Sequence, residues 1–231
     1  MTAPSITADS TVGGFGPGFH GKLPARGDFV AHNLPRGFVK PFDAWLQAAL
    51  AASRGRIGAA WERLFSASPV WRFALSADVC GALPVAGVLV PSADRVGRLY
   101  PFVIAGSLPA AMDLASVPYL ASPWFARAEE LALEACHSGG TDPDLLTGEM
   151  TFLGRPPAVF SGVNPVHRAQ IEAMVGALPD RPSLWWTRGA HWVMPSMVAC
   201  EGLPDGDRFA AFLDNSWEQW GWNDRDGAGG G

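Results

Sequence analysis

The fold of this chain is decided by the stretch Gly87-Val-Leu-Val-Pro-Ser-Ala-Asp-Arg-Val-Gly-Arg-Leu-Tyr-Pro101. The apolar runs at its two ends have the length and composition of buried strands. The short connection between them holds Asp94, Arg95 and Arg98, although a simple hairpin needs only Gly, Asn or Asp for its backbone angles. We therefore expect a rigid strand pair whose turn is either a recognition surface or a fixed cluster of ion pairs.

Other apolar or alternating segments extend this strand pair into a larger sheet. The alternation of Trp71, Phe73 and Leu75 with smaller or polar residues predicts a half-buried strand. The connections from this strand to the next two are short, so the three strands most simply form an antiparallel meander. The strands that we expect cover residues 15–23, 71–75, 85–90, 100–105, 184–187 and 196–200.

Helical periodicity alternates with these strands. Proline is tolerated in a first helical turn, so Pro41 should lie at the start of its helix, and Ser122 should cap another helix. We expect helices near residues 38–50, 57–65, 122–136, 164–175 and 205–213, the last of which could extend to Trp217 and Trp220. The resulting fold class is α/β (α+β), with a mixed, largely antiparallel central sheet packed with helices in a single domain.

Composition supports one folded unit and excludes several classes of protein. The chain has 231 residues, 48% of them hydrophobic, and ten tryptophans, which is enough to bury a full core. We expect a single domain over residues 15–222, between flexible tails at 1–14 and 223–231. The net charge of −5 argues against a nucleic-acid partner. No signal peptide or membrane span is recognisable, so a cytoplasmic location is expected.

Motifs for catalysis or cofactor binding are missing from the sequence. The three cysteines are widely spaced and form no C-x-x-C pair, which indicates buried free thiols. None of the five histidines has metal-ligand spacing, so no metal site is expected. There is no G-x-S-x-G elbow, and Gly21-Lys22 lacks the rest of a phosphate loop. We therefore expect no cofactor and assign no catalytic residue.

Three ordered motifs resemble one known family, the type VI secretion-associated protein TagF, also called ImpM. They are Gly21-Lys-Leu-Pro-Ala-Arg-Gly-Asp-Phe29, Ser68-Pro-Val-Trp-Arg-Phe73 and residues 87–98 of the opening stretch. Shorter segments around Trp45 and Trp185 are also similar, and the resemblance covers about residues 15–215. Ala93 departs from the family pattern, where a larger apolar residue is expected.

The resemblance implies regulation rather than catalysis. TagF proteins act in the bacterial cytoplasm as post-translational repressors of the type VI secretion system. They work opposite a threonine kinase pathway and are linked to the fork-head-associated scaffold protein. The family has no established active-site residues, so only surface roles can be expected of this chain.

The candidate binding residues are charged or polar side chains in or beside the turns of the three motifs. We expect them to form one polar cluster, which either pairs internally to fix the turns or contacts a protein partner. The cluster consists of Lys22, Arg26, Asp28, Arg72, Ser92, Asp94, Arg95 and Arg98.

Two other functions remain open at this stage. A small hydrolase or phosphate-binding enzyme could use His20, Asp28 and the arginines, if these groups converged in one pocket. Alternatively, the protein could be a structural accessory component of the secretion apparatus. Stoichiometric co-purification with the assembled machine would distinguish that role from binding to the scaffold alone.

Overall fold

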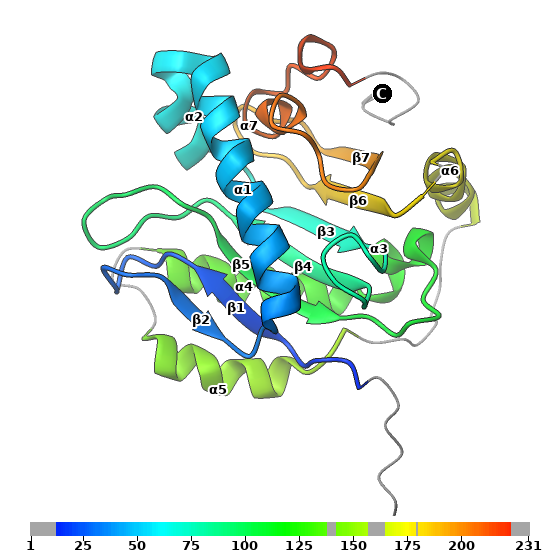
Figure 1. The fold of residues 1–231 in the computed structure, drawn as a ribbon, viewed down its shortest axis with the longest axis horizontal. Coiled ribbons are helices and arrows are strands. Elements are labelled where there is room, and N and C mark those ends of the chain that lie inside the picture. Colours follow the sequence, from blue (N-terminus) through cyan, green and yellow to red (C-terminus); the bar gives the residue numbers. More distant parts are fainter. Residues whose placement is uncertain (1–12, 138–141, 157–164, 179, 223–231) are drawn as a thin grey trace, which may run out of the picture.

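A computed structural model describes residues 13–137, 142–156, 165–178 and 180–222, so the expected tails lie almost wholly outside it. Its centre is one sheet of seven strands in the order β2-β1-β5-β4-β3-β6-β7 (Figure 1). The strands are β1 (Gly18–Gly21), β2 (Val30–His32), β3 (Trp71–Leu75), β4 (Val85–Val90), β5 (Phe102–Ser107), β6 (Pro182–Thr187) and β7 (Ser196–Glu201).

Neighbouring strands in this sheet are antiparallel. The predicted meander of β3, β4 and β5 is confirmed, with Phe73 opposite Gly87 and Gly87 opposite Ala105. The outer strands are added on both sides of the meander. β1 pairs with β5 and carries the short edge strand β2, while β6 pairs with β3 and carries β7. The predicted α/β fold with a largely antiparallel sheet is therefore confirmed.

Helices cover both faces of the sheet (Figure 1). One face packs against α1 (Arg36–Ile57), α2 (Trp61–Ser66) and α7 (Ala211–Asp214). The other packs against α3 (Val117–Leu120), α4 (Ser122–Cys136), α5 (Pro143–Leu153) and α6 (Pro165–Gly176). Short 3₁₀ turns lie at Gly58–Ala60, Leu114–Ser116, Arg208–Ala210 and Glu218–Trp220. Within the described residues, the helices are too short or too polar to cross a membrane.

The two helical layers explain why β3 differs from its prediction. Its five residues are all buried, whereas the alternation predicts a strand with one exposed face. Trp71 and Phe73 face the core that contains α1, and Ala74 faces the core that contains α4. A central strand between two layers needs no polar face, and the one charged residue that it carries, Arg72, finds a partner on α4.

Three helix predictions need correction, and the structure contains one helix that the sequence does not predict. α1 begins at Arg36, so Pro41 lies inside the helix and not at its start. The proline cannot donate a hydrogen bond to the carbonyl of Gly37, four residues earlier. α4 begins at Ser122 itself, and its N-cap is Ala121. α7 ends at Asp214, because its C-cap residue Asn215 has a left-handed backbone with φ 63°, and the helix does not extend to Trp217 and Trp220. α5 is an additional helix, in a segment whose prolines and glycines obscure the periodicity.

Candidate functional site

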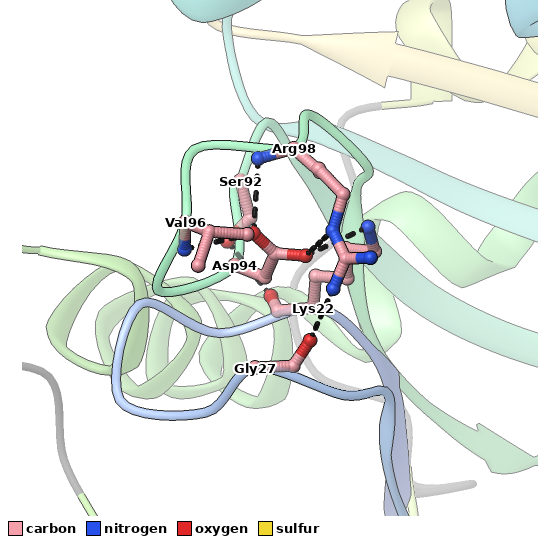
Figure 2. A network of polar contacts seen from close by, with 6 residues as sticks. All are labelled: Lys22, Gly27, Ser92, Asp94, Val96 and Arg98. Carbon is pink, nitrogen blue, oxygen red and sulfur yellow. Dashed lines mark hydrogen bonds and ion pairs between the residues drawn. The ribbon is translucent and has the colours of Figure 1, made fainter.

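The signature loop (residues 91–101) between β4 and β5 is organised around the carboxylate of Asp94. This side chain is completely buried and accepts four hydrogen bonds (Figure 2). Its Oδ1 accepts from the backbone N–H groups of Val96 and Arg98, at 3.0 and 2.9 Å. Its Oδ2 accepts from Lys22 Nζ at 2.9 Å and from Arg98 Nε at 2.6 Å. One residue thus fixes both the turn and its contact with β1.

Lys22 reaches this carboxylate because β1 ends beside the start of β5. At Gly21, φ is +138° and an added Cβ would lie 2.2 Å from the carbonyl oxygen of Pro101. The close approach of β1 to the residue before β5 therefore requires glycine at this position. The hydroxyl of Ser92 donates to the backbone oxygen of Lys22 at 2.8 Å. Lys22, Ser92 and Asp94 are all buried, and together they tie the end of β1 to the signature loop.

The electrostatics of Asp94 follow from these contacts. Burial by itself opposes ionisation and would raise the pKa of this carboxyl. The Arg98 N–H, the Lys22 ammonium, the Arg98 guanidinium and the Val96 N–H outweigh burial and hold the pKa well below its usual range. Asp94 is therefore an anion at neutral pH whose charge is used within the fold.

A second turn, which we call the Arg26 turn (residues 24–29), lies against the signature loop. The backbone N–H of Arg95 donates to the carbonyl of Arg26 at 2.9 Å. Arg98 Nη2 donates to the carbonyl of Gly27 at 2.6 Å (Figure 2). The Arg26 guanidinium faces outward and pairs with Asp142 at 3.2 Å, where both side chains are about half exposed. The two turns form one surface with a shared set of hydrogen bonds.

The outer side of the two turns carries side chains that these contacts leave available. Asp28 and Arg95 are exposed, and within the described parts of the chain neither side chain has a hydrogen bond or ion pair. Val96 and Phe29 are exposed to 68% and 48%, which is high for apolar residues. We define these four residues, Asp28, Phe29, Arg95 and Val96, as the docking face.

Phe29 is a candidate that sequence reasoning missed. Its ring stacks on His20 at 5.6 Å between centroids and meets the edge of Tyr100 at 4.9 Å. Lys22 Nζ lies 5.4 Å from the ring centroid. Phe29 ends the first family motif, but an apolar residue in a motif predicts burial, and only the fold reveals that this ring is held in place while half exposed.

Arg72 lies apart from the other candidates. It projects from β3 and forms a bidentate ion pair with Glu129 of α4, at 2.6 and 2.7 Å, with both side chains largely buried. In the described residues, no hydrogen bond or ion pair joins Arg72 to the remaining seven candidates. The expected single cluster is therefore divided. Seven candidates lie in or beside the signature loop and the Arg26 turn, and Arg72 forms a separate ion pair that connects the sheet to α4.

The groups proposed for an enzyme are arranged differently from the expectation. The carboxylate beside His20 is Asp43 of α1, at 3.2 Å, rather than Asp28. Tyr100 also donates to Asp43, and burial followed by this hydrogen bond raises the pKa of the Tyr100 hydroxyl far above its usual range. Over the described ranges, no three His, Cys, Asp or Glu side chains are grouped as metal ligands. His20, Asp43 and Tyr100 form a partly buried network, and the rings of His20 and Tyr100 both contact Phe29.

The fold and the site define a single-sheet α/β protein with a pre-formed loop surface at one end of the sheet. Residues 18–148 match the model of the TagF N-terminal domain, type VI secretion system-associated, which is more than half of the chain. The protein therefore belongs to the TagF family, as the three motifs predict. The signature loop and the Arg26 turn both lie inside the matched region.

A solved structure supports the same assignment. The crystal structure of PA0076 from Pseudomonas aeruginosa PAO1 is similar to this chain, with 34% sequence identity and a TM-score of 0.75. The similarity covers 87% of this chain and 94% of that protein. No curated protein matches the sequence.

Proposed function

We propose that this protein is a non-enzymatic cytoplasmic regulator, a post-translational repressor of the type VI secretion system. It acts by binding another protein through the docking face, and the fork-head-associated scaffold is the partner that the family resemblance implies. The observation that carries this proposal is that the signature loop and the Arg26 turn have buried, paired charges on the inside and unpaired side chains on the outside. Asp94 and Lys22 are buried and paired with each other, while Asp28, Phe29, Arg95 and Val96 are exposed and have no side-chain ion pair among the described residues.

Such a surface has the physical properties of a protein-binding site. Binding costs free energy when loops must be ordered, and the hydrogen bonds between the two turns remove part of that cost in advance. Energetically important contacts are enriched in aromatic and arginine side chains surrounded by weaker contacts. Phe29 and Arg95 supply this combination, and Asp28 adds a charge that can select between partners.

Three side chains that could act as acids or nucleophiles lie in environments that disfavour catalysis, and this favours a binding role. Tyr100 stays neutral, and its proton is directed at Asp43 inside the fold. Burial raises the pKa of Cys80 to about 12 and that of Cys136 to about 11, so these thiols are poor nucleophiles at neutral pH. These observations support a regulator rather than a hydrolase.

The test is an affinity purification from the native bacterium, with and without its threonine kinase, using the wild-type chain and the Phe29→Ala variant. We expect the scaffold to co-purify with the wild-type chain and to be lost with Phe29→Ala, while the variant keeps its melting temperature. A matched control is Phe152→Ala, which removes an aromatic ring that is 86% exposed on α5. Equal recovery of the scaffold by Phe29→Ala, or stoichiometric recovery of the whole secretion machine, would contradict the proposal.

A further inference from the structure

The connection between β6 and β7 forms a second exposed surface, which we call the hairpin tip (residues 188–195). It lies at the other end of the sheet from β1 and β2 and outside the residues matched by the family model. Trp192 is exposed to 40% and Met194 to 65%, whereas Val193 between them is buried in the core. One buried residue thus anchors two outward apolar side chains.

The backbone of the hairpin tip is held by its own hydrogen bonds. Ala190 N–H donates to the carbonyl of Val193 at 2.8 Å, and Met194 N–H donates to Asn215 Oδ1 at 3.0 Å. Gly189 has φ +83°, and an added Cβ would lie 2.7 Å from the carbonyl oxygen of Val193. The apolar residues are therefore presented in a fixed arrangement, which lowers the cost of binding a partner.

Two basic side chains contact Trp192, and a third lies in the same tip. The Arg63 guanidinium of α2 lies 5.1 Å from the centroid of the Trp192 ring, and the ring of His191 meets Trp192 edge-on at 4.4 Å. Arg188 is exposed in the same tip. Within the described ranges, none of these three basic groups has a carboxylate partner, although the whole chain has a net charge of −5. The tip is thus a small cationic and apolar surface on an acidic protein.

We propose that the hairpin tip binds an acidic protein segment that carries an apolar side chain as its anchor. The indole of Trp192 and the thioether of Met194 take the apolar anchor, and Arg63 and Arg188 pair with carboxylates on either side of it. Aromatic residues, Met and Arg are the residue types enriched at protein interfaces. An anionic membrane is the less suitable occupant, because the net negative charge of the chain opposes its approach to such a surface.

The proposal can be tested with the full chain, without knowing the partner, by NMR titration. The probe is a short synthetic peptide in which glutamates alternate with leucine and phenylalanine. The signals followed are the Met194 methyl group, one of six methionine methyls, and the Trp192 indole N–H. We expect these two signals to shift and saturate, while a peptide with lysine in place of each glutamate leaves them unchanged.

Matched variants identify the groups responsible. The double substitution Arg63→Gln and Arg188→Gln should weaken binding of the acidic peptide roughly tenfold, because two charge pairs are lost. Trp192→Ala should abolish the Met194 shift. The control pair Arg36→Gln and Lys40→Gln removes the same charge from the exposed start of α1 and should have no effect.

Three outcomes would overturn the proposal. They are no shift with the acidic peptide, equal weakening by the control pair, and a shift produced by anionic phospholipid vesicles but not by the peptide. The proposal is independent of the secretion role, since Phe29→Ala leaves the hairpin tip intact and should not alter this titration.

Discussion

Lys22 Nζ lies 2.9 Å from Asp94 Oδ2, and this contact joins two residues that are 72 positions apart in the sequence and belong to two different family motifs. Asp94 has no solvent-exposed side-chain surface, and Lys22 has only 10%. A buried charge that loses its partner is strongly destabilising, whereas the intact pair contributes little net stability. The main effect of the contact is therefore to fix where the signature loop lies against the end of β1.

Replacing Asp94 with Asn should lower the melting temperature by about 5–10 °C, because Lys22 keeps a buried charge without its counter-ion. Thermal unfolding followed by circular dichroism measures this effect. Asp28→Asn is the control, since it makes the same chemical change at an exposed position in the neighbouring turn. A similar melting temperature for both variants would show that the buried pair is not needed.

The stability contributed by Asp94 should depend on pH in a defined direction. Its pKa in the folded protein lies below the value of about 3.9 expected for an unfolded chain. The contribution is therefore complete above that pH and is lost as the pH falls through the folded-state pKa. The difference in melting temperature between wild-type protein and Asp94→Asn should be constant near neutral pH and shrink below about pH 4. A difference that stays constant into this acidic range would refute the assignment.

The ion pair between Arg72 and Glu129 offers a test of burial without involvement of the docking face. Arg72→Met should cost roughly 3 kcal/mol of unfolding free energy, because Glu129 loses its partner in a largely buried position. The double variant Arg72→Met with Glu129→Leu should be more stable than the single one, since neither charge remains. Denaturant unfolding of the single and double variants measures both free energies. A cost below about 1 kcal/mol for Arg72→Met is the value expected for an exposed ion pair and would contradict the burial of this one.

Arg95→Ala separates a contact role from a structural one. The Arg95 side chain is exposed and has no ion pair with a described residue, so the melting temperature should change by less than about 2 °C. Binding of the purified scaffold, measured by calorimetry, should weaken at least about tenfold. Arg36→Ala, at an exposed position on α1, should leave binding unchanged. A large loss of melting temperature with Arg95→Ala would instead indicate a structural role.

Substitution by alanine should have opposite effects on stability at Gly87 and at Gly148. At Gly87 in β4 an added Cβ would lie 2.4 Å from Phe73 Cζ and 2.6 Å from the carbonyl oxygen of Ile104, so Gly87→Ala should cost at least roughly 1–3 kcal/mol. At Gly148 in α5 a Cβ meets no atom within 4 Å, and Gly148→Ala should stabilise the protein by roughly 0.5–1 kcal/mol. Chemical denaturation of the two variants provides the comparison, and equal effects would contradict the packing described for β4.

The central meander is predictable from sequence because its order is encoded locally. Short connections leave β3, β4 and β5 few alternatives to antiparallel pairing. The pairing of β1 with β5 is not encoded in this way, since the partner is chosen by distant packing. The three-residue strand β2 is too short to show any periodicity.

In the candidate site, too, locally encoded features are predictable from the sequence and contacts between distant segments are not. The motifs identify Lys22 and Asp94 as special, but their contact depends on the long-range pairing of β1 with β5. Arg72 belongs to a motif and to an alternating strand, and its separate partner on α4 becomes apparent only when both faces of β3 are covered. Phe29 escapes prediction because composition alone cannot distinguish an exposed ring from a buried one.

The position of β1 in the sheet has a consequence for synthesis of the chain. β1 is translated early, yet its pairing partner β5 reaches the ribosome exit only after β3 and β4 have been made. Contacts over such long separations slow folding, because the intervening chain must first be ordered. A nascent chain that stops before Phe102 therefore lacks the inner partner of β1, which until then has only the three-residue strand β2 to pair with.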